Sequence, residues 1–386
     1  MLNYNSLMHW DFYSVRSSGF EGQLAMADRD PSLRILMVVP RLETGGMETT
    51  VLEQARYLRA QGLDVHLLAL MSGGSLCERA DTWGIPLTMA TETLTLRPAA
   101  AFIDRTAKAL DIHIVHSHTG TWLPAALGAR RRAIPHVHTR HGFVTTRGTL
   151  MSEFMGARMT RHVICVSGEL LQHSRRVLRV PPHRSEYLGN GIDLSNLPDR
   201  SAPTDTQTAL VMICRLAPVK NIALALDALR QARERSPSIS LTIIGDGPER
   251  EALMRRSTDL GIADAVTFRG QLDHPWIDVP GGAIFIQSSD SEGLSLSLIE
   301  AMAAGCRVVA TDVGQTRAFT TGASGVMLIP PRHASGLAEA IVAMVSMAPE
   351  HARQAEASNR SHASVAGNLA HKVTRLREIY REVLDV

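Results

Sequence analysis

The sequence predicts an α/β protein of two doubly wound domains, each with a parallel sheet covered by helices on both faces. The chain has 386 residues, more than one compact core usually organises. From residue 34 onward, apolar runs of strand length alternate with amphipathic segments of helix length, which is typical of parallel sheets with right-handed crossovers. The alternation stops at 197–207, a stretch rich in Pro, Ser, Thr and Asp, and then restarts. We therefore expect two domains joined by one linker.

The first domain is expected over residues 33–198. Its strands are predicted at 34–39, 65–70, 112–116, 136–138 and 163–166. Helices are predicted between them at 47–60, 76–83, 98–110, 123–132 and 150–160, with another starting at Gly168. Residues 1–32 have no basic segment followed by an apolar one, so they do not resemble a signal peptide. We expect a poorly ordered extension there, with an amphipathic surface anchor as the alternative.

The second domain is expected over residues 208–363, after a linker at 199–207. Its strands are predicted at 210–213, 240–244, 266–268, 283–286 and 308–310, and its helices at 222–235, 248–260, 295–304 and 337–347. The segment 364–386 is expected to hold one final helix, at 364–384, which could pack back on the first domain. Open parallel sheets bind ligands beyond the carboxyl ends of their strands. The sequence therefore places the functional site in a cleft between two facing sheets.

Composition excludes several classes of protein. Hydrophobic residues make up 45% and charged residues 20%, as in ordinary globular proteins. No apolar run reaches the roughly 18–20 residues that a membrane span needs, so any membrane contact is expected to be peripheral. Neither a disulfide framework nor a zinc site is indicated, because no C-x-x-C pair occurs among Cys77, Cys165, Cys214 and Cys306. A reducing cytoplasm fits this pattern.

Charge is distributed unevenly along the chain. The net charge is +2, yet residues 130–184 hold eleven arginines against Glu153 and Glu169, a local charge of +9. Such a stretch suggests an anionic partner, for example a phospholipid surface, a lipid diphosphate or a nucleic acid. A solvated arginine-rich face is the alternative interpretation.

A glycine pair stands at the first predicted strand–helix junction, within RLETGGMET at 41–49. Gly45 and Gly46 let a phosphate approach the backbone, and the helix N-terminus that follows supplies amides and partial positive charge. The segment lacks the third glycine of a dinucleotide-binding motif and the Lys-Ser/Thr of a P-loop, which argues against NAD and ATP. A tight turn between strand and helix is the alternative.

Two cations and two carboxylates follow strands of the second domain. Arg215 and Lys220, five apart in CRLAPVKN, can converge on one diphosphate. In SSDSEGLSLSLIEAMAAG, Glu292 lies in the loop and Glu300 lies inside the helix. The first carboxylate is suited to sugar hydroxyls and the second to a ribose diol, while the amides of 293–295 face a diphosphate. A glutamate that only complements the helix dipole is the alternative.

In this combination and order, the chain resembles the retaining glycosyltransferases of family 4, which have the GT-B fold of two Rossmann-like domains. The resemblance covers residues 34 to about 384. It rests on seven motifs in family order: Gly-Gly, TRHG, NGID, R-x4-K, IIGDGPER, FRG and E-x7-E. It implies a nucleotide-sugar donor bound by the second domain, an acceptor bound by the first, and no resident cofactor or metal.

The resemblance implies catalytic roles for four residues. Arg215 and Lys220 would bind the donor diphosphate and stabilise it as the leaving group. Glu292 would contact the donor sugar near its reacting carbon. His141, in TRHG, would lie close to the transferred sugar and hydrogen-bond it.

The resemblance also implies the donor-binding residues. Gly45 and Gly46 would cradle the phosphate, and Glu300 would hold the ribose. Asn190 and Gly191 would form a turn that borders the cleft. The remaining donor contacts are implied at Gly245, Gly247, Gly270, Gln271, Gly293, Leu294 and Ser295.

Histidines and departures from the family pattern bear on these roles. A metal cluster is one interpretation of His116, His118, His138 and His141. The resemblance instead places them at strand ends that line the acceptor side, and no D-x-D motif follows a strand to hold a metal.

The sequence departs from the family pattern at four positions. The departures are Asn221 and Gln315 in place of glycines, Ser295 in place of Gly or Pro, and Arg307 in place of a proline. None of these removes a charged catalytic group, whereas Gln315 could alter the choice of donor.

The expected reaction is front-face displacement with retention of configuration. The donor is expected to be a UDP- or GDP-sugar and the acceptor a surface polysaccharide, a lipopolysaccharide or a lipid-linked sugar at the inner face of the cytoplasmic membrane. Docking is expected through residues 130–184, with Arg130–Arg132, Phe143, Arg147 and 171–179 as its basic and apolar groups. No nucleic-acid partner is expected. The alternatives are a GT-B-like sugar-nucleotide epimerase and a non-catalytic scaffold that binds a nucleotide sugar.

Overall fold

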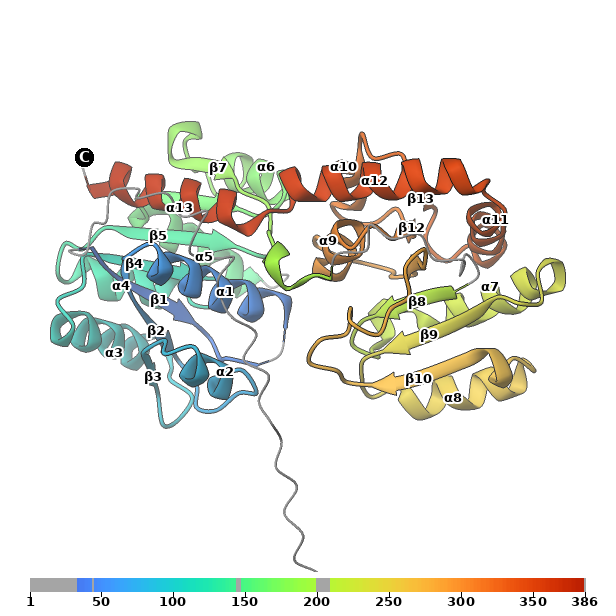
Figure 1. Cartoon of the computed structure of the whole chain (residues 1–386). Helices are drawn as coiled ribbons and strands as arrows, with labels where there is room; N and C mark the ends of the chain where they lie inside the picture. The colour runs from blue at the N-terminus through green and yellow to red at the C-terminus, as the bar shows by residue number, and fades with distance from the viewer. Residues whose placement is uncertain (1–32, 44, 144–146, 199–208, 385–386) are drawn as a thin grey trace, which may run out of the picture.

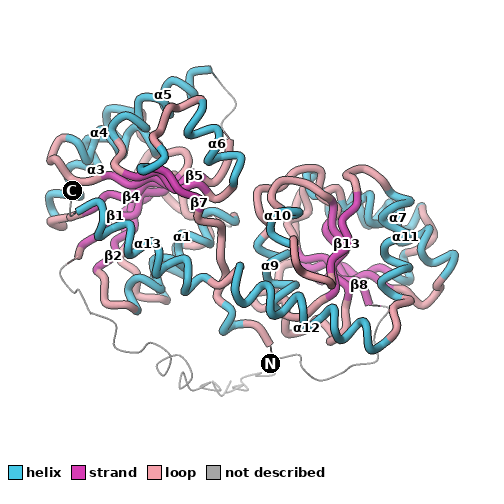
Figure 2. The backbone as a smooth tube through the Cα atoms, turned by 90° about the horizontal axis from the view of Figure 1, so that it is seen from above, coloured by secondary structure: helices cyan, strands magenta, loops and turns pink. Residues whose placement is uncertain are grey.

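The computed structural model describes residues 33–43, 45–143, 147–198 and 209–384, which form two α/β domains side by side (Figure 1). The expected N-terminal extension at 1–32 and the linker at 199–207 lie outside the described residues. Both sheets are parallel throughout, as the alternation of strands and helices predicts. Helices cover both faces of each sheet (Figure 2). The predicted fold class, two doubly wound parallel-sheet domains, is therefore confirmed.

The first sheet has seven strands in the order β3-β2-β1-β4-β5-β6-β7. They are β1 (Arg34–Val39), β2 (Asp64–Ala69), β3 (Leu87–Met89), β4 (Ile114–His118), β5 (His136–Arg140), β6 (His162–Cys165) and β7 (Ser185–Tyr187). The two edge strands, β3 and β7, are absent from the sequence prediction. Each has three residues and neither is fully buried, so no apolar run marks it.

Two layers of helices enclose this sheet. They are α1 (Gly46–Ala60), α2 (Cys77–Thr82), α3 (Leu96–Ala109), α4 (Trp122–Arg130), α5 (Arg147–Met159) and α6 (Gly168–Arg176). Figure 2 shows α3, α4 and α5 on one side of the sheet and α1 on the other. The central strand β1 is buried from both sides: Ile35 and Met37 face the core under α1, whereas Leu36 and Val38 face the core under α3 and α4.

The second sheet has six strands in the order β10-β9-β8-β11-β12-β13. The strands are β8 (Ala209–Ile213), β9 (Ser240–Ile244), β10 (Val266–Gly270), β11 (Ile284–Gln287), β12 (Arg307–Thr311) and β13 (Val326–Ile329). Its helices are α7 (Ile222–Arg235), α8 (Arg250–Asp259), α9 (Leu296–Ala303), α10 (Thr316–Thr320), α11 (Ala334–Val345) and α12 (Pro349–Ala366). Helices α7 and α11 share one apolar core with the sheet, and α9 and α12 share the other.

The C-terminal segment differs from its prediction. One helix was expected over 364–384, but the chain breaks between α12 and a separate helix, α13 (Leu369–Leu384). At the break, Ile192 donates its N–H to Gly367 O at 2.9 Å and accepts from Leu369 N at 3.0 Å. A Cβ on Gly367 would lie 2.3 Å from Ile299 Cγ2, so this crossing suits glycine. Helix α13 then packs on the first sheet beside α1, with Val373, Leu376 and Ile379 buried in that core.

Both sheets repeat one topology. In each, the strand order reverses beside the first strand, between β1 and β4 and between β8 and β11. Connecting helices leave on opposite faces at such a point, and the loops after the two strands separate to form a crevice. The loops at the carboxyl ends of the two sheets meet: Gly168 N, after β6, lies 3.5 Å from Gln315 Oε1, after β12.

Candidate active site between the two domains

An ion pair occupies the switch point of the second sheet. Lys220 lies in the loop after β8, and Glu292 lies in the loop after β11. Lys220 Nζ donates to Glu292 Oε1 at 2.5 Å, with side-chain exposures of 23% and 11%. Ser289 Oγ donates to the same carboxylate oxygen at 2.7 Å. The structure thus brings together two predicted catalytic side chains that are 72 residues apart in the sequence.

The loop that carries Lys220 is fixed by the next residue, Asn221. Its φ is 44°, in the left-handed region where glycine and asparagine are tolerated best. The side-chain oxygen caps α7 by accepting from Leu224 N at 3.3 Å, and the side-chain amide donates to Asp290 Oδ1 at 2.9 Å. Asp290 also pairs with Arg332 at 2.9 Å, and these contacts hold the pKa of its carboxyl below the usual range. Asn221, in place of the family glycine, therefore adopts the same left-handed turn, and its side chain also links the loops after β8 and β11.

The loop that carries Glu292 is hydrogen-bonded to the loops after β8 and β12. Ser288 Oγ donates to the carbonyls of Lys220 and Asn221, and Asp290 N donates to Val219 O at 2.9 Å. On the other side, Gln315 N donates to Gly293 O at 2.8 Å. A Cβ on Gly314 would lie 2.0 Å from Glu292 O, so glycine is needed there.

Helix α9 begins directly after this loop. Ser295 is its N-cap, and its hydroxyl accepts from Leu298 N at 3.3 Å. The amides of Gly293, Leu294 and Ser295 make no hydrogen bond to another described residue, so the helix start offers donors for an anion. The side chain of Leu294 itself is buried in the core, which leaves its backbone for any contact.

Glu300 projects from α9 into a cavity between the domains. Its Oε2 accepts from Trp276 Nε1 at 2.9 Å. Burial raises the pKa of Glu300, and the indole hydrogen bond opposes this rise.

Arg215 is exposed at the end of β8 and its side chain contacts no described carboxylate. Burial raises the pKa of the neighbouring Cys214 to about 11, so that thiol stays protonated beside the ion pair.

The glycines of the second domain allow close approaches of backbone to backbone. Gly245 has φ 133°, and a Cβ there would lie 2.0 Å from Cys214 O. A Cβ on Gly247 would lie 2.4 Å from Leu216 O. Gly245 N donates to Gly270 O at 2.7 Å, which joins the ends of β9 and β10. Gln271 follows directly, so these predicted donor positions share one edge of the sheet.

The first domain presents a helix start and a histidine pair. Gly45 is the N-cap of α1; a Cβ on Gly46 would meet nothing within 4 Å, whereas one on Gly45 would lie 2.6 Å from Glu48 Oε2. His141, just after β5, lies with its Nε2 3.0 Å from His118 Nδ1, and its backbone N donates to Thr119 Oγ1 at 2.7 Å. Burial lowers the pKa of His141 to about 4, so the ring is neutral at physiological pH.

The other histidines belong to a buried network along β4 and β5. His116 Nδ1 lies 2.7 Å from the Tyr380 hydroxyl, and Ser117 Oγ lies 2.8 Å from His136 Nε2 and 2.7 Å from His138 Nδ1. Burial lowers the pKa of these rings, that of His136 to about 3. Within the described ranges, no group of three or more His, Cys, Asp or Glu is placed to hold a metal ion.

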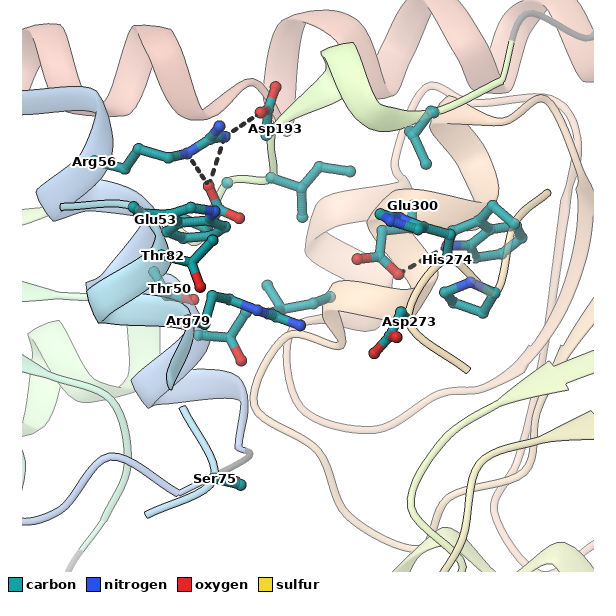
Figure 3. A pocket seen from close by; sticks show the side chains of 18 of the residues that line it. Thr50, Glu53, Arg56, Ser75, Arg79, Thr82, Asp193, Asp273, His274 and Glu300 are labelled. Atoms are coloured by element: carbon teal, nitrogen blue, oxygen red, sulfur yellow. Dashed lines mark hydrogen bonds and ion pairs between the residues drawn. The ribbon is translucent and has the colours of Figure 1, made fainter. Parts of the chain in front are cut away.

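A cavity of about 700 Å³ lies between α1 and α2 of the first domain and the β10–β11 connection and α9 of the second (Figure 3). Of the predicted site residues, Gly191 and Glu300 are in its lining. Arg56 pairs there with Glu53 at 2.9 Å and with Asp193, which also accepts from Tyr57 Oη at 2.7 Å. Neither this cluster nor Trp276 was predicted from the sequence. Glu53 and Arg56 are three residues apart on α1, but Asp193 and Trp276 are distant in the sequence and no motif marks them.

Comparisons with known proteins agree with this architecture. The family Glycosyltransferase Family 4 matches residues 44–196, and the family Glycosyl transferases group 1 matches residues 207–347. A phosphatidyl-myo-inositol mannosyltransferase of Mycobacterium leprae is 28% identical over 336 residues, which are 81% of this chain and 87% of the relative.

Solved structures share the fold. A glycosyltransferase from Rickettsia africae superposes with a TM-score of 0.80 at 19% identity, covering 91% of this chain and 98% of that one. Anabaena HepE in complex with UDP superposes with a TM-score of 0.75 at 18% identity, covering 91% and 100%. No described helix is both long and apolar enough to cross a lipid bilayer. With family matches in both halves and two facing parallel sheets, the chain belongs to glycosyltransferase family 4 and has the GT-B fold.

Proposed function

We propose that this glycosyltransferase moves a hexose from a UDP- or GDP-sugar to a glycan or lipid-linked acceptor, with retention of configuration, in the synthesis of cell-surface polysaccharide or lipopolysaccharide. The observation that carries the proposal is the Lys220–Glu292 pair at the switch point of the second sheet, beside the start of α9, where the amides of 293–295 bond to no described residue. The relative from Mycobacterium leprae is a mannosyltransferase, and HepE was solved with UDP. We propose no resident metal or cofactor.

The donor is held by the second domain. Glu300, on the helix that starts beside the ion pair, is oriented by Trp276, and its other oxygen accepts no hydrogen bond from a described residue. A ribose diol donating to this carboxylate would make a charge-assisted pair of hydrogen bonds. The diphosphate then lies over the α9 amides, within reach of Lys220 and of the exposed Arg215.

Transfer proceeds on one face of the sugar. The bond from the anomeric carbon to the diphosphate oxygen breaks, and Lys220, Arg215 and the α9 amides stabilise the negative charge that develops there. The acceptor hydroxyl attacks from the same face, and its proton leaves with the diphosphate. Glu292 orients the donor sugar through its hydroxyls. His141 acts as a neutral hydrogen-bonding group, because its pKa of about 4 leaves it uncharged.

The acceptor side faces a membrane. Phe143, 51% exposed, follows His141, and Met151 and Met155 on α5 are 61% and 48% exposed. These apolar groups lie within the arginine-rich stretch 130–184, as in surfaces that bind anionic bilayers peripherally. We propose docking at the inner face of the cytoplasmic membrane. Unchanged binding to anionic vesicles after charge reversal of Arg130–Arg132 would contradict it.

Donor binding is the first test. Isothermal titration of UDP, GDP, ADP and their common sugar conjugates should show a preference for one nucleotide. Glu300→Ala should weaken that binding by about 10- to 100-fold, because a hydrogen bond to a charged group contributes about 1.5–3 kcal/mol. The control is Glu339→Ala on the exposed face of α11, which removes the same charge without touching the site.

The outcomes separate the rival functions. Binding of one nucleotide sugar, followed by a product whose anomeric configuration matches the donor by NMR, supports a retaining transferase. An inverted product would refute the mechanism. Conversion of the donor sugar without an acceptor would indicate an epimerase. Tight binding without turnover of any tested acceptor would favour the scaffold, and no binding at all would refute the assignment of the donor site.

A further inference from the structure

A second cavity lies at the other end of the first sheet. Its volume is about 710 Å³, and its lining includes His136, Arg161 and His162, at or just before the starts of β5 and β6, and Arg184, just before β7. Glu382, near the end of α13, also lines it, and Figure 1 shows this end of α13 turned away from the second domain. Strands of four or five residues separate the cavity from the cleft, roughly 15 Å. The cavity is therefore distinct from the donor site.

Positive charge dominates this cavity. Its lining holds four arginines and one carboxylate, Glu382, which already accepts from Arg375 Nη1 at 2.7 Å. None of the four arginines pairs with a carboxylate of the described chain. The half-buried Arg184 is held in place by the carbonyls of Ala157, Thr160 and Arg161. An anion is thus the complementary ligand; the four arginines are Arg130, Arg158, Arg161 and Arg184.

A buried histidine adds an unused hydrogen-bonding atom. His162 is 7% exposed and lines the cavity, and its buried Nε2 has no hydrogen-bond partner among the described residues. Burial lowers the pKa of this ring, so it is neutral at physiological pH and offers one N–H donor. A buried polar atom without a partner is uncommon in folded proteins and indicates a missing ligand or water. A phosphate oxygen would satisfy it after a small rotation of the ring toward the cavity.

The apolar stripe of α5 leads to this cavity. Met151, Met155 and Arg158 are four and three residues apart, so they follow one face of the helix. The two methionines are exposed, and Arg158 lines the cavity at the end of α5. Phe143, after the carboxyl end of β5, is also exposed and contacts His173 of α6. A soluble anion would not contact the apolar stripe. A lipid would contact both features, with its phosphate in the cavity and its chains beside α5.

We propose that this cavity binds the phosphate group of an anionic membrane lipid that is not a substrate, and so anchors the first domain with α5 lying in the membrane interface. A lipid held there cannot reach the donor, because the sheet lies between them. This anchor rests on the membrane docking of the proposed function but not on the sugar-transfer reaction. It leaves the cleft free for the acceptor.

The test compares two pairs of cationic residues of the first domain. Arg130→Gln with Arg161→Gln removes two charges from the cavity, and Arg105→Gln with Lys108→Gln removes two exposed charges of α3, outside the cavity and outside the stretch 130–184. Cosedimentation of the full chain with phosphatidylcholine vesicles containing phosphatidylglycerol should show at least about a tenfold loss of affinity for the cavity pair. The control pair should lose less than about threefold. Equal losses would overturn the proposal in favour of diffuse charge attraction.

A variant without any charge change sharpens the test. His162→Phe removes the Nε2 donor from a ring that is already neutral, so diffuse electrostatics predicts no effect. We expect a severalfold loss of vesicle affinity, with the thermal transition as the check on folding. Vesicle binding identical to the wild type in a folded His162→Phe protein would overturn the role of this ring.

Two further titrations identify the source of the phosphate and isolate the cleft. If inorganic phosphate binds in an Arg161-dependent way while anionic vesicles do not bind, the cavity is a site for free anions and the lipid proposal is wrong. UDP titrations should give the same affinity in all these variants, because none of the changed residues lies at the cleft. If the wild type bound none of UDP, GDP and ADP, the donor site would be refuted, while the vesicle result would stand independently.

Discussion

Replacing Glu292 by glutamine should strengthen binding of the free nucleoside diphosphate and slow sugar transfer at the same time. In the structure, Lys220 Nζ is already engaged by Glu292 Oε1 at 2.5 Å, and Ser289 Oγ supports that carboxylate oxygen. A diphosphate therefore competes with Glu292 for the same ammonium group. Glutamine keeps the size of the side chain and an oxygen for Ser289 but removes the competing charge.

The magnitude follows from the burial of the pair. Exposed ion pairs contribute about 0.2–1 kcal/mol, and breaking buried pairs costs about 3–5 kcal/mol. Lys220 and Glu292 keep 23% and 11% of their side-chain exposure, so the pair lies between these limits. Releasing Lys220 to the diphosphate should contribute about 1–2 kcal/mol, which is roughly a 5- to 30-fold tighter complex. Turnover should fall by about 100-fold or more, because a contact to the reacting sugar is lost.

The assay measures both quantities on one preparation. Isothermal titration gives the affinity for the nucleoside diphosphate that the wild type prefers, and product formation gives kcat. Asp290→Asn is the matched control, because it makes the same change two residues away on a carboxylate that contacts Asn221 and Arg332 instead. The control should bind the diphosphate within about twofold of the wild type. Unchanged or weaker diphosphate binding in Glu292→Gln would refute the competition for Lys220.

Three further predictions concern stability. Asn221→Ala should lower the free energy of unfolding in urea by about 1–2 kcal/mol and Asn221→Gly by only a few tenths, because alanine loses the cap and strains the left-handed turn; equal losses would contradict this. Gly245→Ala should lower the urea midpoint more than Asn221→Ala does, since its Cβ would lie 2.0 Å from Cys214 O. An unchanged midpoint would show that the backbone at 245 moves away from Cys214 without cost. Stability should also fall as pH drops below about 6.5, by up to about 1.4 kcal/mol per pH unit for each buried histidine, because the unfolded chain takes up protons that the folded rings, with lowered pKa, do not. Urea midpoints that stay constant from pH 7 to pH 5 would rule out neutral rings at His116, His118, His136, His138 and His141.

Most of the fold was predictable from local patterns, although the apolar run of β13 and the helix α12 were not predicted. Central strands such as β1 and β11 are buried on both faces and stand out as continuous apolar runs. The edge strands β3 and β7 have three residues each and no such run, so periodicity does not detect them. The break at Gly367 was missed for a different reason. Gly367 and Asn368 are both poor helix formers and do mark it, but the contact with Ile192 that fixes the break comes from the other domain.

The candidate site was predictable as a set of positions but not as a set of partners. The sequence places Lys220 and Glu292 after strands, which indicates the edge of the sheet but not the 2.5 Å contact between them. Trp276 carries no motif, yet it donates to Glu300 from a connection whose path only the folded chain defines. Asn221 looked like a departure from the family. Its φ of 44° shows instead that it meets the same backbone requirement as glycine and adds a cap.

The contacts between the domains differ in strength, and from this difference we expect the domains to hinge about the stronger contact. At one end, Ile192 is bonded on both sides to Gly367 and Leu369, and α13 is buried in the first domain. At the other end, the contact from Gly168 N to Gln315 Oε1 is 3.5 Å long, at the limit of a hydrogen bond. Rotation about the first contact would break the second and move His141 relative to the donor site. The Lys220–Glu292 pair lies wholly in the second domain and would survive that rotation, so we expect a nucleotide sugar to bind there before closure brings the first domain over it and excludes water.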